Sequence, residues 1–176
     1  MKKMANLLQY GETGLDYHFN YSRELQIEYF KKHIQLANEM NLPIIIHARE
    51  AHCDVYNILK EYEVNKKGIM HCYSGNLDFM KKFVQLGFYI SFGGSITKSD
   101  KYDNIIKETP IDRIIIETDA PLMPPIQLGK GARNESKYLR YVIKKISKIK
   151  EVNPTELEKI FFKNACDIYN IKLLES

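Results

Sequence analysis

The stretch Leu42-Pro43-Ile44-Ile45-Ile46-His47 decides the fold, because it is a continuous apolar run that ends on a side chain able to bind metals. Three other runs have the same form: residues 7–11 lead into Glu12, residues 68–70 into His71, and residues 114–118 into Asp119. Continuous rather than alternating hydrophobicity is typical of parallel strands that are covered on both faces. We therefore expect each run to be a buried strand.

Helical patterns separate these runs. Apolar residues recur at steps of three and four over 27–37, 51–62 and 77–84, with Asn76 as a predicted N-cap. A loop over 120–131 precedes two last helices, the second of which begins after Asn153. Alternating strands and helices predict βαβ units and a parallel sheet in one domain over residues 1–176. The expected strands lie near residues 7–11, 43–47, 68–71, 88–91 and 113–117.

Composition excludes several classes of protein. The 176 residues are 44% apolar and 27% charged, as in ordinary globular domains, and no run approaches the ~20 apolar residues of a membrane span. The net charge of +4 comes from lysine pairs scattered along the chain, so charge alone does not predict nucleic-acid binding. Three widely spaced cysteines indicate reduced thiols in an intracellular protein.

The polar residues that end the strands predict a metal centre. The carboxyl ends of parallel strands meet at one edge, so Glu12, His47, His71 and Asp119 should lie together there. Histidine and carboxylate ligands suit Zn, Mn or Mg, and such a cation activates water for hydrolysis. Asp119 could also accept a proton from that water. Alternatively, each histidine is an ordinary buried hydrogen-bonding residue, and each carboxylate caps a helix.

Other groups are candidates for holding an anion. Ser74 lies where a strand turns into a helix, and the Gly93-Gly94 pair offers free backbone N–H groups, unless it is simply a tight turn. Arg49 and Arg133 are the basic residues nearest to the expected centre, and an arginine fork matches phosphate, although a surface ion pair explains each equally well. Cys72 should point away from His71, which argues against a thiol nucleophile.

Five segments in register resemble the TatD-related deoxyribonucleases, a family of metal-dependent hydrolases with TIM-barrel folds. They are residues 11–17 (GETGLDY), 42–49 (LPIIIHAR), 71–75 (HCYSG), 117–121 (ETDAP) and 131–135 (GARNE). The resemblance implies a nuclease that hydrolyses DNA phosphodiesters with two divalent cations (Mg, Mn or Zn), and hence DNA as partner in the cytoplasm or nucleus.

The same resemblance implies roles for individual residues. Glu12 matches a bridging carboxylate, His47 and His71 match ligands of one metal, and Asp119 matches the ligand of the other metal and the base. Four further residues would place the substrate phosphate or shape its pocket. They are Arg49, Ser74, Arg133 and Asn134.

One departure from the family is large. The His-x-His strand with which the family begins does not occur here, and five expected strands are three short of a closed (β/α)₈ barrel. We therefore expect an incomplete TIM-type α/β barrel, truncated at its amino terminus, with weak or absent nuclease activity. Its open edges should favour self-association. Two alternatives stay open: a hydrolase of small amides or lactones, and a barrel remnant that binds without catalysis.

Overall fold

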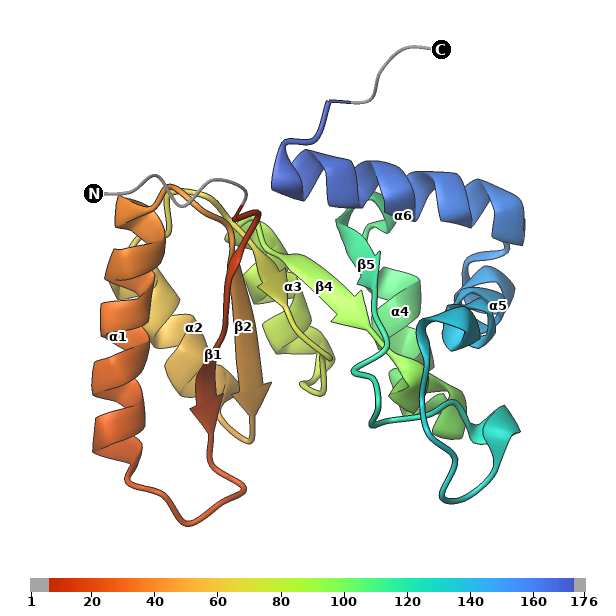
Figure 1. Cartoon of the computed structure of the whole chain (residues 1–176), viewed down its shortest axis with the longest axis horizontal. Helices are drawn as coiled ribbons and strands as arrows, with labels where there is room; N and C mark the ends of the chain where they lie inside the picture. The colour runs from red at the N-terminus through yellow and green to blue at the C-terminus, as the bar shows by residue number, and fades with distance from the viewer. Residues whose placement is uncertain (1–6, 173–176) are drawn as a thin grey trace.

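The computed structural model describes residues 7–172, which form a five-stranded parallel sheet with helices packed against it (Figure 1). The strands pair in the order of the sequence, as expected when each βα unit adds one strand beside the last. Within these residues β1 and β5 are the two edges of an open sheet. The strands are β1 (Tyr10–Asp16), β2 (Ile44–Arg49), β3 (Ile69–Met70), β4 (Tyr89–Phe92) and β5 (Ile114–Ile116).

All five predicted strands are present, but two of their boundaries were wrong. β1 begins at Tyr10 and continues to Asp16, and β2 continues to Arg49, so Glu12 and His47 lie inside strands rather than after them. The apolar run stops at the first polar side chain, whereas the backbone pairing continues, with Leu15 opposite Ala48. A polar face on the last part of each strand explains the difference.

The helices confirm the predicted alternation and the predicted caps. Asn76 accepts a hydrogen bond from the Phe79 N–H at 2.9 Å, and Asn153 accepts one from the Thr155 N–H at 2.9 Å. Short 3₁₀ turns occupy residues 94–98, 100–102, 111–113, 126–128 and 136–138. The α-helices are α1 (Arg23–Glu39), α2 (His52–Glu61), α3 (Leu77–Gln85), α4 (Asp103–Glu108), α5 (Leu139–Lys150) and α6 (Pro154–Tyr169).

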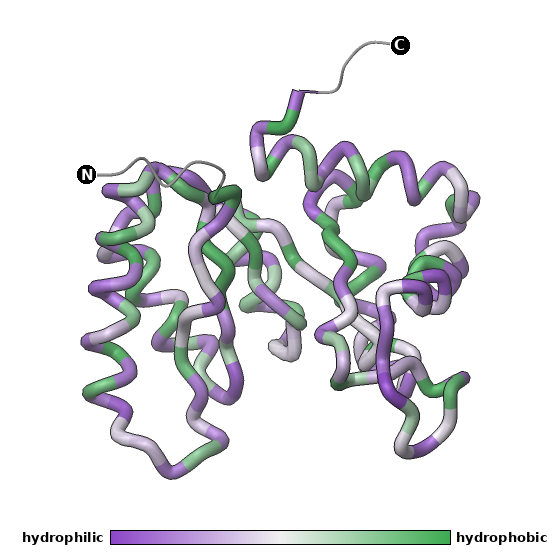
Figure 2. The backbone as a smooth tube through the Cα atoms, in the orientation of Figure 1, coloured by the Kyte–Doolittle hydropathy of each residue, from purple (hydrophilic) through white to green (hydrophobic). Residues whose placement is uncertain are grey.

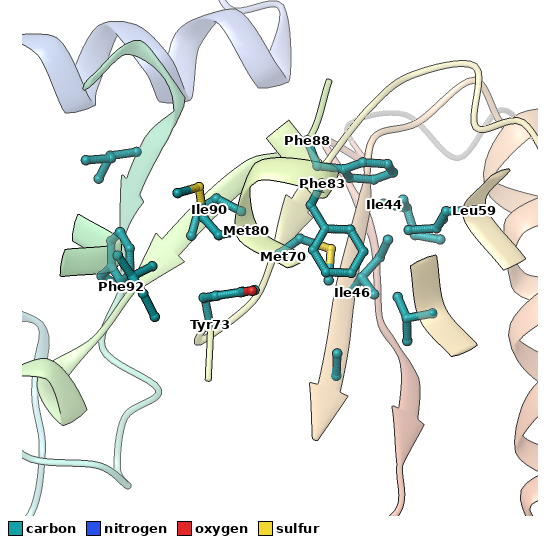
Figure 3. Close-up of a cluster of buried hydrophobic side chains, with 14 of the residues drawn as sticks. Ile44, Ile46, Leu59, Met70, Tyr73, Met80, Phe83, Phe88, Ile90 and Phe92 are labelled. Atoms are coloured by element: carbon teal, nitrogen blue, oxygen red, sulfur yellow. The ribbon is translucent and has the colours of Figure 1, made fainter. Parts of the chain in front are cut away.

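The main core lies between the sheet and the helices that cover its outer face (Figure 3). Ile44 and Ile46 from β2 point into it together with Met70 and Ile90, and each is at most 1% exposed. The helical side of this core includes Phe83 of α3, and the hydropathy-coloured backbone shows apolar and polar positions interleaved along the helices (Figure 2). One face of each strand is thus buried by helices.

A second, smaller apolar cluster lies on the opposite face of the sheet. Ile45, Ile69 and Ile115 pack there against Ile168 of α6, which explains why the strand sequences are apolar at successive positions. The Tyr169 hydroxyl donates to Gln9 Oε1 at 2.6 Å, just before β1 starts, so the last turn of α6 lies near the beginnings of the strands (Figure 1). The other end of this inner face is left to polar residues. No helix within residues 7–172 has the length and hydropathy needed to cross a lipid bilayer.

Candidate metal centre

The four residues predicted to gather at the sheet edge do lie together. Glu12 Oε1 is 3.0 Å from His47 Nδ1 and 3.5 Å from His71 Nε2. His71 Nε2 is in turn 3.7 Å from Asp119 Oδ1. Side chains from β1, β2 and the loops after β3 and β5 therefore form one continuous chain of polar contacts on the inner face.

Local irregularities of the backbone aim these side chains. One extra residue lies between Tyr10 and Thr13 relative to the facing stretch of β2, which makes a bulge in β1 at Glu12. His71 follows a strand of only two residues and is held by its N–H, which donates to Ile46 O at 2.8 Å. Asp119 takes a left-handed backbone conformation, with φ of 59°. Bulges and such conformations are common where a side chain must be redirected toward a functional site.

Two acidic residues that the sequence interpretation missed complete the network. Asp16 Oδ2 lies 3.0 Å from His47 Nε2, and Glu117 Oε2 lies 2.5 Å from His71 Nδ1. Alternation along a strand contained the signal, because Glu12 and Asp16 are four residues apart and so share a face of β1.

The protonation of both histidines follows from their partners. Carboxylates only accept hydrogen bonds, so a ring nitrogen that faces one carries a proton. The hydrogen bond with Glu12 raises the pKa of His47 despite burial, and Asp16 adds to this effect. Burial opposes the charged form of His71, but Glu117, Glu12 and Asp119 outweigh burial and raise its pKa to about 9.

The carboxylates respond in opposite directions. The hydrogen bond with His47 lowers the pKa of Glu12, against burial and with help from the charge of His71. Burial raises the pKa of Asp119, as do the charges of Glu117 and Glu12, although His71 acts against them. Asp119 is therefore the more basic of these two carboxylates, which suits a group that accepts a proton.

Cys72 is poorly suited to act as a nucleophile. Burial, together with the charges of Glu117 and Asp119, raises the pKa of its thiol to about 12. The thiolate is the reactive form of cysteine, and it is not populated at neutral pH under these conditions. The sequence-based argument against a thiol mechanism therefore agrees with the electrostatics of the site.

Pairs of these side chains have the spacing expected of two ligands on one divalent cation. Two ligands that each lie about 2.1 Å from one ion are about 3.0–3.4 Å apart, and the contacts of Glu12 with His47 and His71, at 3.0 and 3.5 Å, are close to that range. Within residues 7–172, however, no three His, Cys, Asp or Glu side chains are already grouped tightly enough to enclose an ion. Cation binding would therefore draw Glu12, His71 and Asp119 together by small side-chain movements.

Three of the four predicted substrate-binding residues are exposed. Arg49, at the end of β2, and Arg133 form no ion pair among the described residues, and Arg49 lies over the Phe19 ring at 5.8 Å. Ser74 is exposed, and its hydroxyl donates to Ala48 O at a long distance of 3.4 Å. These three side chains remain available to an anion.

Asn134 is placed differently, because its side chain is buried within the loop that follows β5. It is 2% exposed, and its Nδ2 donates to the carbonyls of Thr118 and Leu122 at 2.7 and 2.8 Å. Its backbone N–H also donates to Pro121 O at 3.0 Å. Since the side chain is fully used inside the loop that carries Asp119, Asn134 holds that loop in place.

The Gly93-Gly94 pair also has a packing role. A Cβ at Gly94 would lie 2.3 Å from Met123 O, so only glycine allows the same loop to pack against the end of β4. Thr97 Oγ1 accepts a hydrogen bond from the Ile126 N–H at 2.9 Å and fixes the loop farther along. The segment that follows Asp119 is thus anchored at both of its ends.

The comparisons with known proteins agree with this fold. The family model described as TatD related DNase matches residues 3–170. The Bacillus subtilis protein named uncharacterized metal-dependent hydrolase YabD is 42% identical over 165 residues, which are 92% of this chain and 64% of that protein. Escherichia coli YcfH, with the same description, is 34% identical over 92% of this chain and 62% of its own length.

Solved structures give the same result. The crystal structure of YJJV, a TatD homologue from Escherichia coli, superposes with a TM-score of 0.84 at 28% identity over 93% of this chain and 64% of that one. The chain therefore spans a little under two thirds of the length of these relatives. The comparisons do not support the expected amino-terminal truncation, which stays a prediction. They confirm a fold of the TatD TIM-barrel type, and the chain belongs to the TatD-related DNase family.

Proposed function

We propose that this chain is a metal-dependent hydrolase of DNA phosphodiester bonds. The observation that carries the proposal is the contact network of Glu12, His71 and Asp119 at the carboxyl edge of a parallel sheet, where α/β folds place their chemistry. The descriptions of the matched family and of its relatives, a DNase and metal-dependent hydrolases, support the reaction class.

The residues that would hold divalent cations are Glu12, His47, His71 and Asp119. Their mixture of imidazole and carboxylate donors suits Zn or Mn, and also Mg at the carboxylates. When bound, such a cation supplies Lewis acidity and lowers the pKa of water toward neutrality. The number of cations, two in the complete family fold, is part of the proposal.

The chain's own groups provide the remaining steps. Asp119 accepts a proton from the attacking water, because burial and neighbouring carboxylates raise its pKa above that of an exposed aspartate. Arg49 and Arg133 present exposed guanidinium groups that can each bind a phosphate through two hydrogen bonds. Ser74 offers an exposed hydroxyl, which donates to Ala48 O at 3.4 Å.

The test combines metal binding and DNA cleavage on the full chain. We expect the chelator-treated protein to bind Mn²⁺, measured by the electron paramagnetic resonance signal of free Mn²⁺, and to cleave end-labelled DNA only in its presence. Glu12→Gln should lose both properties, since it removes the charge that contacts both histidines. Glu39→Gln, on the exposed end of α1, is the matched control.

The outcomes separate the alternatives. Mn²⁺ binding with cleavage of amide or lactone substrates, but not of DNA, would replace the nuclease by a small-molecule hydrolase. Mn²⁺ binding without any hydrolysis would identify a non-catalytic remnant. A wild-type chain that binds no divalent cation would refute the metal centre itself.

A further inference from the structure

We propose that Glu117 is the residue that positions His71 for cation binding. Glu117 holds Nδ1 of the imidazole and thereby leaves Nε2 to face the centre. This inference deepens the proposed function and rests on its metal centre, but it concerns a residue that touches the histidine rather than the cation or the substrate.

Both oxygens of Glu117 are used, and each has a different partner. Oε2 lies 2.5 Å from His71 Nδ1, and Oε1 accepts the Cys72 N–H at 2.5 Å. The Glu117 carboxylate therefore contacts the His71 side chain and the Cys72 backbone at the same time. Only 13% of the His71 side chain and 20% of the Glu117 side chain are exposed, so water competes little for these contacts.

The opposite nitrogen of His71 points where a ligand should point. Nε2 lies 3.5 Å from Glu12 Oε1 and 3.7 Å from Asp119 Oδ1, on the far side of the ring from Glu117. Because the carboxylate of Glu117 only accepts, the proton of a neutral His71 resides on Nδ1 and the lone pair on Nε2. That tautomer is the one required of a ligand at this place.

His47 provides an internal comparison. Its Nδ1 faces Glu12 and its Nε2 faces Asp16, both at 3.0 Å, so carboxylates contact both of its nitrogens without distinguishing one as the ligand. His71 differs, because its Nδ1 contact is short and buried and its Nε2 contacts are longer. Ligating histidines characteristically donate their second N–H to a carboxylate in this way.

A small residue on β4 leaves room for the contact between Glu117 and the segment of His71. Glu117 follows β5 and His71 follows β3, with β4 between them, and the β4 chain reaches this level at Gly93. A Cβ at Gly93 would lie 3.7 Å from both Cys72 Sγ and Glu117 Cγ. One methyl group fits there at ordinary contact distance, but a branched side chain would enter the space between Glu117 and Cys72.

The direct test is Glu117→Gln. The carboxamide keeps the size of the side chain but replaces one oxygen by an NH₂ donor, so either His71 Nδ1 or the Cys72 N–H would face a donor instead of an acceptor. We expect Mn²⁺ affinity to fall by about 10–100-fold, the usual effect of removing such a partner. Nitrogen-15 NMR of histidine-labelled protein should also show loss of the hydrogen-bonded Nδ1 proton of His71.

Three variants serve as controls or as a second approach. Glu39→Gln and Gly93→Ala should retain wild-type affinity, since the first is remote and the second fits. Gly93→Val should weaken Mn²⁺ binding in the same direction as Glu117→Gln without changing any polar group. Thermal unfolding measured by circular dichroism shows whether each variant folds. If Glu117→Gln does not fold, the Mn²⁺ affinity of Gly93→Val tests the inference.

The inference is overturned if Glu117→Gln binds Mn²⁺ within twofold of the wild type and keeps the Nδ1 proton signal of His71. Its failure is distinguishable from failure of the proposed function. If the wild type binds no cation, the metal centre is refuted, whereas the proton signal of the cation-free protein still reports whether Glu117 fixes His71.

Discussion

Replacing Asn134 by alanine should loosen the loop that carries Asp119 and weaken the candidate centre from a distance. The Asn134 side chain is 2% exposed and donates to Thr118 O at 2.7 Å, to Leu122 O at 2.8 Å and, less closely, to Met123 O at 3.2 Å. Its Oδ1 also accepts the Glu135 N–H at 2.9 Å. A single side chain thus joins both ends of the loop.

The expected loss of stability follows from these contacts. Two short hydrogen bonds to carbonyls contribute about 0.5–1.5 kcal/mol each, and carbonyls left without a partner add to the cost where water cannot reach them. We expect the free energy of unfolding to fall by about 2–3 kcal/mol. For a domain of this size that is a decrease in Tm of about 4–10 °C.

The assay pairs Asn134→Ala with Asn164→Ala. Asn164 is also 2% exposed and donates to Ile111 O at 3.0 Å and Ile114 O at 2.8 Å, at the beginning of β5, away from the centre. Urea unfolding should show similar losses for both variants. Only Asn134→Ala should weaken Mn²⁺ binding, by about tenfold, because it alone releases the loop of Asp119. Equal Mn²⁺ affinities in the two variants, or a stability loss for Asn134→Ala below about 0.5 kcal/mol, would refute the reasoning.

Three further predictions concern packing and protonation. Gly14→Ala should lower the free energy of unfolding in urea by more than about 3 kcal/mol. The φ of Gly14 is 147°, and a Cβ on this residue would lie 1.9 Å from His47 O. A loss below about 1 kcal/mol would contradict the close approach of β1 to β2. Phe83→Ala should cost about 3–5 kcal/mol in the same assay, since Phe83 is fully buried, whereas Phe162→Ala, 60% exposed, should change little. The free energy of unfolding of the cation-free protein should fall by about 3 kcal/mol between pH 6.5 and 9. The folded state raises the pKa of His71 to about 9, so the stabilisation from protonated His71 is complete below pH 6.5 and disappears as the pH rises through 9. Urea unfolding across this range should show a steeper decrease of stability in the wild type than in His71→Asn, in which only the raised pKa of His47 remains.

The order of the secondary structure was predictable because its signals are local. Apolar runs and helical periodicity depend on neighbouring residues, and caps such as Asn76 and Asn153 act within three residues. The sequence did not predict the extent of β1, because the bulge at Glu12 depends on the pairing of β1 with β2. Nor does the periodicity of α6 reveal that its Ile168 packs on the inner face of the sheet.

The site was predictable to the extent that it depends on strand ends. Parallel strands bring their carboxyl ends to one edge whatever their separation in sequence, and this alone placed His47, His71 and Asp119 together. The role of Glu117 depends on a contact across β4 with a residue 46 positions away. The sequence does not reveal that the Asn134 side chain is directed into the loop, because tertiary packing sets that direction.

The charges of the centre show why protons and cations compete for it. Two imidazoles contact four carboxylates here, those of Glu12, Asp16, Glu117 and Asp119. The raised pKa values of His47 and His71 mean that two imidazolium charges offset these carboxylates. A ligating nitrogen cannot keep its proton, so a divalent cation replaces positive charge that the site already attracts and releases protons as it binds. For His71 only the Nε2 proton would have to leave, because Glu117 faces Nδ1 and would hold the proton on that nitrogen. The centre can therefore exchange a proton for a cation without reorienting this ring.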